Sequence, residues 1–201
     1  SVATVDFSAA GVSDNLAGLT TGGGAVSASM AKIDAKDADV NVTVTDAALA
    51  LADIADLNAL TVATNGVITA TLTDTLANLA TLATASTDAI TVTVTSLSNA
   101  AADLLTLDGK TSVEVVATAM TDISGTFDDV KAVVITADDA NTINTDGDYD
   151  ATISDTTIAA TSLSEIDGDT SGTVTATAAT TITGTAADVI TAIQSTGITT
   201  A

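Results

Sequence analysis

The chain has 201 residues, of which 46% are hydrophobic and only 1% aromatic, so its core must be built from aliphatic side chains. Its 26 acidic and four basic residues give a net charge of −22 at pH 7, which excludes a nucleic-acid partner, because binding to phosphate requires a basic surface. The absence of histidine and cysteine excludes Ser-His-Asp and Cys-His catalysis, so the composition predicts a protein that is not an enzyme.

Residues 1–42 differ from the rest of the chain, and we interpret them as a divergent N-terminal unit or a cap. Within them, Ser1–Phe7 (SVATVDF) alternates apolar and polar residues, which is typical of a strand and makes it a candidate assembly segment. The glycine run Thr21–Gly24 (TGGG) predicts a bend rather than a phosphate-binding loop, because the chain has no G-x-x-x-x-G-K-[ST] motif.

An internal repeat organises residues 43–201. Leu107–Val130 aligns with Ile166–Val189 without a gap, with 14 identities in 24 positions and an offset of 59 residues. The same register places the segment from Thr93 against the segment from Thr152, and a third copy begins at Thr43. The pattern predicts three repeated units over residues 43–201.

Each unit contains short runs with a period of two, namely Ile68–Thr73 (ITATLT), Ile90–Thr95 (ITVTVT) and Thr173–Ala178 (TVTATA). These runs predict half-buried strands with the apolar side chains on one face and threonines on the other. The segments that follow, from Asp74 and from Gly184, carry apolar residues at helical spacing and predict short helical arms.

The pattern of a strand, a short helical arm and a turn recurs about every 20–25 residues. Such a pattern is typical of one coil of a solenoid. We therefore predict a mainly β fold, a parallel β-solenoid with about 20–25 residues per coil and short helical arms. The absence of proline fits this prediction, because every strand N–H in a stacked ladder needs a partner.

An acidic loop, Asp138–Asp150 (DDANTINTDGDYD), is the main candidate for a specific site. Its five acids are Asp138, Asp139, Asp146, Asp148 and Asp150. Calcium takes about six to eight oxygen ligands, and the carboxylate and amide oxygens of such a loop could supply them. Ca2+ is therefore the predicted cofactor. The alternative is a solvated insertion loop, because the spacing does not match an EF-hand.

Other acids are interpreted as structural. The LDG at Leu107–Gly109 and the IDGD at Ile166–Asp169 predict turns, with calcium bridged by Asp167 and Asp169 as the alternative. Acids that follow strands, such as Asp46 and Asp155, are interpreted as helix caps rather than metal ligands.

The segment Ser154–Thr199, which contains SDTTIAATSLSEIDGDTSGTVTATAATTITGTAADV, resembles the tandem repeats of very large extracellular proteins of marine bacteria and cyanobacteria. Some of those proteins carry calcium-binding repeats. The composition is also similar to that of bacterial surface-layer proteins. The resemblance implies an extracellular or cell-surface location and a structural or adhesive role.

The ends of such a rod would present unpaired strand edges, which are templates for further pairing. We therefore expect identical subunits as partners, associating head to tail or by strand exchange through Val2, Val5, Phe7 and Ile198. The alternative is that both ends belong to a longer chain.

The predicted function is that of an extracellular structural repeat protein that self-associates into a surface filament or layer. One alternative is an adhesin stalk with calcium-stabilised repeats. A second is ice binding through rows of threonine, interrupted at Glu114 and Val116, the candidates being Thr69, Thr71, Thr91, Thr93, Thr173 and Thr175. We expect no membrane insertion, because every apolar run is short, and the acidic surface favours divalent cations.

Overall fold

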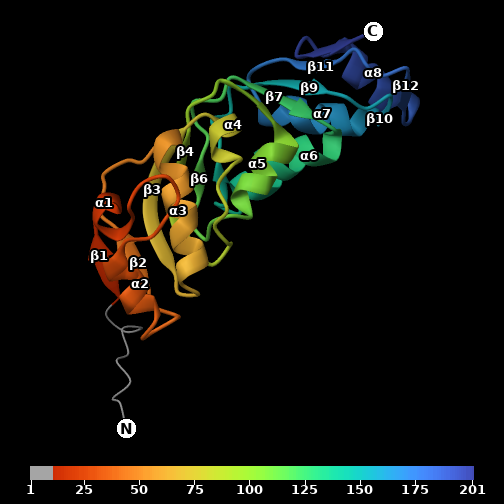
Figure 1. Ribbon diagram of the computed structural model, residues 1–201. Coiled ribbons are helices and arrows are strands. Elements are labelled where there is room, and N and C mark those ends of the chain that lie inside the picture. Colours follow the sequence, from red (N-terminus) through yellow and green to blue (C-terminus); the bar gives the residue numbers. More distant parts are fainter. Residues whose placement is uncertain (1–10) are drawn as a thin grey trace. The chain divides into compact units, whose positions relative to one another are not determined.

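The computed structural model describes residues 11–201, in which short strands alternate with helices (Figure 1). These residues form two compact units. The first unit runs to Thr93 and also contains Leu107–Val115, and the second contains Val94–Thr106 and Val116–Ala201. The predicted boundary after residue 42 concerns the sequence repeats and stays a prediction.

In the first unit, four strands lie side by side in chain order. Its elements are β1 (Val12–Asp14), α1 (Leu16–Leu19), α2 (Ala28–Asp34), β2 (Val42–Val44), α3 (Leu51–Ala63), β3 (Ile68–Asp74), α4 (Leu76–Leu79) and β4 (Ala89–Val94), of which the last residue belongs to the second unit. Val42 lies beside Val12 of β1 on one side and beside Ile68 of β3 on the other, and both pairings are parallel. Parallel neighbours need a crossover connection, and the helices supply it.

The second unit continues the alternation. Its elements are β5 (Ser98–Ala100), α5 (Ala101–Asp108, which ends in the first unit), β6 (Val115–Val116, which begins there), β7 (Asp122–Gly125), α6 (Phe127–Lys131), the π-helix η1 (Ala132–Ala137), β8 (Ile143–Asn144), β9 (Asp150–Ile153), β10 (Thr157–Ala159), α7 (Ala160–Asp169), β11 (Val174–Ala176), β12 (Thr181–Thr183), α8 (Ala186–Gln194) and β13 (Ile198–Thr200).

Five strands of the second unit form a parallel sheet in the order β13-β11-β9-β7-β5, and β10 and β12 form a separate parallel pair. The register aligns Ile123, Ala151, Val174 and Ile198 across four neighbouring strands. These four apolar residues are buried and belong to the core of the unit.

The strands have one buried and one open face. In the first unit, Ile68 and Ile90 are buried, whereas Thr69 and Thr91 are exposed. The predicted strands at Ile68, Ile90 and Thr173 are confirmed as β3, β4 and β11, and the helical arms after Asp74 and Gly184 are confirmed as α4 and α8. An open face is unusual for a parallel sheet, which helices commonly cover on both sides.

The prediction of a mainly β parallel solenoid is wrong. The chain is an α/β protein with parallel sheets, and its helices contain more residues than its strands. The sequence argument underestimated the segments between strands: α3 has 13 residues and buries Ile54, Leu57 and Leu60. Alanine and leucine have high helix propensity, so these segments form crossover helices (Figure 1), whereas the threonine-rich strands stay short.

Candidate functional site

The acidic loop holds its first carboxylate against its own backbone. Asp138 follows η1, and its Oδ1 accepts hydrogen bonds from the backbone N–H of Thr145 at 2.7 Å and from the Thr145 hydroxyl at 3.1 Å. These bonds close the turn around β8. Asp138 therefore has a structural partner at a position that was predicted to bind calcium.

The remaining acids of the loop lie apart. Asp150 accepts the backbone N–H of Thr173 at 2.6 Å through its Oδ1, which ties β9 to the start of β11. Asp139, Asp146 and Asp148 are exposed. Among residues 11–201, no three Asp, Glu, His or Cys side chains are grouped so that they could hold a metal ion. Calcium binding by this loop stays a prediction.

Tyr149, like Ile143, is a buried residue of this loop. Its hydroxyl donates a hydrogen bond of 2.5 Å to Asp169 at the end of α7. Burial, together with this hydrogen bond and the negative charge of Asp169, raises the pKa of Tyr149 well above its usual range. This hydrogen bond between Tyr149 and Asp169 was not predicted from the sequence, although Tyr149 is the only tyrosine in the chain.

The predicted turn at Ile166–Asp169 is wrong, because these residues are the last four of α7. Asp167 accepts a hydrogen bond from the Ser195 hydroxyl at 2.8 Å, and Asp169 accepts a hydrogen bond from the Tyr149 hydroxyl. Both acids predicted as alternative calcium ligands thus connect α7 to other parts of the second unit. The glycine run is confirmed as a bend, since Gly22, Gly23 and Gly24 all have positive φ angles.

Acids that follow strands cap helices, as predicted for Asp46 and Asp155. The Oδ2 of Asp46 accepts the backbone N–H of Leu16 at 2.6 Å, and that of Asp155 accepts the N–H of Phe127 at 2.7 Å. Asp74, at the end of β3, does the same for Leu51 at 2.7 Å. In each case the carboxylate lies after one strand and caps the helix that follows the neighbouring strand.

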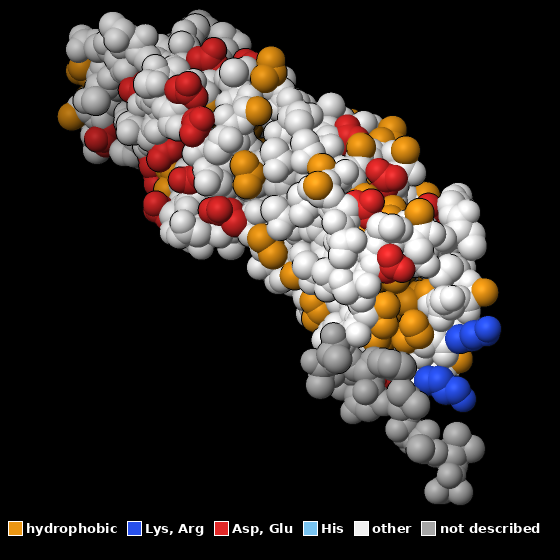
Figure 2. Space-filling view, turned by 90° about the vertical axis from the view of Figure 1, so that its left-hand side faces the viewer, with side chains coloured by type: hydrophobic (Ala, Val, Ile, Leu, Met, Phe, Trp, Pro, Cys, Tyr) orange, Lys and Arg blue, Asp and Glu red, His pale blue; other side chains and the backbone are white. Residues whose placement is uncertain are grey.

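The physical reason is that the first N–H groups of a helix have no partner within it and carry a partial positive charge. Asp74 also accepts hydrogen bonds from the Asn78 side chain and the Thr75 backbone. The Asn78 bond, with the backbone bonds of Thr75 and Leu51, lowers the pKa of Asp74. Figure 2 shows acidic side chains spread over one face rather than gathered in one pool, as expected where carboxylates serve separate helix ends.

Three threonines, which precede β3, β6 and β11, connect these segments to backbone carbonyls earlier in the chain. The hydroxyls of Thr64, Thr111 and Thr170 donate to the carbonyls of residues 40, 90 and 149, at 2.7, 2.6 and 2.5 Å respectively. Each hydroxyl also accepts the N–H two residues later. Gly172 is needed in one of these turns, because a Cβ there would overlap the carbonyl of Tyr149. The recurring Thr-x-Gly or Thr-x-Val signal was visible in the sequence.

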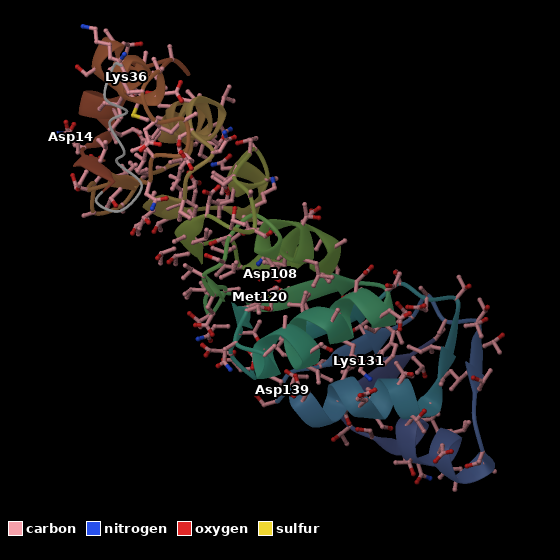
Figure 3. The ribbon with its side chains drawn as sticks, turned by 90° about the horizontal axis from the view of Figure 1, so that it is seen from below. Asp14, Lys36, Asp108, Met120, Lys131 and Asp139 are labelled. Carbon is pink, nitrogen blue, oxygen red and sulfur yellow. The ribbon has the colours of Figure 1, made fainter. Side chains whose placement is uncertain are left out.

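Two of the four lysines have defined partners within their own unit. Lys110 donates to the carbonyls of Ala80 at 2.7 Å and Leu82 at 2.6 Å, and burial lowers its pKa. Lys131 lies on α6 on the side toward α7, where its ammonium is 2.6 Å from a Glu165 carboxylate oxygen (Figure 3). It also lies 5.7 Å from the centre of the Phe127 ring.

The end of the second unit is the remaining candidate site. Ile198, predicted as an assembly residue, is 9% exposed and lies in β13, which pairs with β11 alone among the described strands. β12 likewise pairs with β10 alone. The other predicted assembly residues, Val2, Val5 and Phe7, lie outside the described residues.

The helix α8, which follows β12 in the chain and packs against β13, exposes two isoleucines: Ile190 is 50% and Ile193 53% exposed. We call the edges of β12 and β13 with these two side chains the C-terminal surface. Residues 171–201 contain one acid, Asp188, and no base, although the whole chain carries −22. Ile190 and Ile193 were not singled out from the sequence. The 59-residue offset of the repeat nevertheless aligns Ile190 with Lys131, so an apolar side chain in the second copy replaces a cation in the first.

Within residues 11–201, no helix has the length and apolar character needed to cross a membrane. The structure gives no support to the surface-layer and adhesin roles that the resemblance implied. Comparison with known proteins finds no family model, no curated protein and no solved structure that matches the chain.

Proposed function

We propose that the chain is a structural, non-catalytic protein that associates with further copies of itself through the C-terminal surface. The observation that carries this proposal is the combination of two strands with an unpaired edge and two half-exposed isoleucines in a segment almost free of charge. Unpaired strand edges pair readily with another chain, and depletion of charge is typical of the centre of an interface.

Covering the exposed isoleucines of this surface is favourable. Complete burial of an isoleucine stabilises by about 1.5–3 kcal/mol, so covering the exposed halves of Ile190 and Ile193 contributes roughly 1 kcal/mol each. The net charge of −22 per copy repels a second copy and so opposes association. This repulsion is screened by salt, whose Debye length falls from about 10 Å at 0.1 M to about 3 Å at 1 M. Association should therefore strengthen as salt is added.

Sedimentation velocity of the full chain over a range of concentrations, at low and high salt, tests the proposal. Replacing Ile190→Lys and Ile193→Lys together should weaken association about tenfold or more, because two cations would enter an apolar contact. The matched control is Leu97→Lys, at a position 58% exposed in the same unit but away from α8. A monomer at every concentration and salt, or equal effects of the double variant and the control, would contradict the proposal.

A second candidate, ice binding, is favoured by the register of the open sheet faces. Thr43 pairs with Thr69 in the first unit, and Thr152, Thr175 and Thr199 are in register in the second. Neighbouring strands are about 4.8 Å apart and alternate residues about 6.6 Å, so the hydroxyl and methyl groups form a regular array. Thermal hysteresis measurements test this candidate. Thr69→Lys should abolish the activity and Thr106→Lys, on α5, should not; absence of hysteresis in the unmodified chain eliminates it.

A further inference from the structure

The helix α8 presents an apolar face to solvent. One side of the helix packs against α7 and β13, and Ala192 is fully buried there. The solvent-facing side carries Ala186, Ile190 and Ile193, which are all exposed and stand at positions i, i+4 and i+7. This is the spacing of the anchor residues with which an amphipathic helix lies in an apolar groove of a partner.

The first unit contains an apolar groove of about 460 Å³ between α2 and α3. Its lining consists of glycine, alanine and valine apart from Asp34. Val62 of α3 is 89% exposed, more than any other large apolar side chain of residues 11–201. Gly24, also in the lining, is fixed to α3, because its N–H donates to Oδ1 of Asp56 at 2.5 Å. The groove therefore offers small residues on which bulky aliphatic side chains fit.

Charge favours a second copy of the chain as the occupant of this groove. Residues 15–36, which include α2 and part of the lining, contain two lysines and one acid, so their net charge is +1. Residues 171–201, which include α8, contain one acid and no base. These two segments attract one another weakly, in a chain whose copies otherwise repel one another because each carries −22.

We propose that α8 of one copy docks in the groove between α2 and α3 of another copy, where Ile190 and Ile193 contact Val62. This inference rests on the proposed self-association and identifies the surface of the partner. Helices approach closely where the side chains at their contact are small, as in this groove. The contact joins two different surfaces, so each copy can bind two others and association leads to rings or filaments, not to a symmetric dimer.

Cysteine cross-linking tests the pairing directly, since the chain has no cysteine of its own. Val62→Cys and Ile190→Cys are prepared as separate full-length variants, mixed in equal amounts and oxidised mildly. We expect mixed dimers to exceed self-paired ones, and intact mass spectrometry distinguishes them because the two variants differ in mass. The control mixture pairs Val62→Cys with Leu97→Cys, at a position 58% exposed in the second unit, and should give only the statistical proportion of mixed dimers.

A cation placed in the groove gives an independent readout. Val62→Lys should weaken self-association about tenfold in sedimentation velocity, because its ammonium would be covered by apolar side chains. The side chain of Val62 is 89% exposed, so the single chain should fold as before, which circular dichroism checks. The matched control is Leu51→Lys, at a position 49% exposed at the start of α3 and outside the groove. It should leave association unchanged or slightly stronger, because repulsion falls.

The outcomes separate the two proposals. If copies associate but Val62→Lys behaves as Leu51→Lys does, or mixed dimers stay at the statistical proportion, docking in the groove is wrong while self-association stands. Preferential self-pairing of Ile190→Cys would indicate a symmetric contact between two α8 helices and would overturn groove docking as well. Lower stability of Val62→Lys with unchanged association would show that the chain fills its own groove, and would also overturn it. If no association is observed under any condition, both proposals fail.

Discussion

The two copies of the 24-residue repeat, Leu107–Val130 and Ile166–Val189, have similar sequences and different surroundings. Both lead into a helix whose N-cap threonine, Thr126 or Thr185, accepts the N–H three residues later. In the first copy, Val130 is fully buried and the following Lys131 pairs with Glu165 of α7. In the second copy, Val189 is half-buried and the following Ile190 is half-exposed.

The difference shows which properties belong to the repeat and which come from its neighbours. Local hydrogen bonds, such as the threonine cap, recur because they involve residues three positions apart. The burial of Val130 and the capping of Phe127 by Asp155 depend on the segment of the chain that follows the first copy. Sequence identity therefore predicts the helix, whereas its burial depends on the segment packed against it.

The largest expected effect is on the buried valine. Val130→Ala should lower the free energy of unfolding by about 2–3 kcal/mol, because it removes two methyl groups and leaves a cavity. Val189→Ala should cost about 1 kcal/mol or less, since that site is half-buried. Urea denaturation followed by circular dichroism compares the two. Equal losses would show that the second copy is as well covered as the first.

The next largest effect on the free energy of unfolding is expected at Asp155, which caps the helix of the first copy of the repeat. Asp155→Ala should destabilise by about 1 kcal/mol, because it leaves the N–H of Phe127 at a helix start without its carboxylate. Asp139→Ala, at an exposed acid, should stay within about 0.5 kcal/mol of the unmodified chain. The same urea titration measures both variants. If Asp139→Ala and Asp155→Ala lowered the free energy of unfolding equally, Asp155 would not be a specific helix cap.

Acidification should weaken another cap of this type. The folded-state pKa of Asp74 lies below the unfolded value of about 3.9, so its contribution is fully present above that value and is lost as the pH falls through the folded pKa. Asp74→Asn should therefore be less stable than the unmodified chain at pH 6, with a difference that shrinks by pH 3. Asp14→Asn, which loses no bond from a neighbouring helix, should show a smaller difference at both values. Urea midpoints at pH 6 and pH 3 provide the test.

The smallest effect is expected at the ion pair that distinguishes Lys131 from Ile190. Its side chains are 38% and 40% exposed, so solvent and salt screen the attraction. Lys131→Ala should cost about 0.5 kcal/mol at low salt and less at 1 M salt. A double-mutant cycle with Glu165→Ala isolates the coupling. A coupling that persists at high salt would mean that packing of the lysine stem, rather than charge, connects α6 to α7.

Much of the local structure could be predicted from the sequence. The alternation of apolar residues with threonine identified β3, β4 and β11, and the helical spacing after Gly184 identified α8. These patterns depend on a few successive residues. The fold class could not be derived in the same way, because the alternating runs are conspicuous but short, and the segments between them gain their helical structure from packing such as that of Leu57 and Leu60.

The candidate site was predicted only in part. Asp46 and Asp155 were identified as helix caps from their positions after strands, whereas the assembly role of Ile198 stays a prediction. The partners of Asp46 and Asp155 lie 30 and 28 residues away, a distance that depends on the crossover and not on a local pattern. Ile190 and Ile193 were missed because an exposed isoleucine on an amphipathic helix has the same sequence signature as a buried one.

The burial of Tyr149 has a practical consequence. The chain contains one tyrosine and no tryptophan, so its near-ultraviolet absorbance and intrinsic fluorescence come mainly from this side chain. Its raised pKa means that the phenol ionises in alkaline solution chiefly after the second unit opens. Absorbance of tyrosinate can therefore record the opening of that unit without an added label, while circular dichroism follows the whole chain.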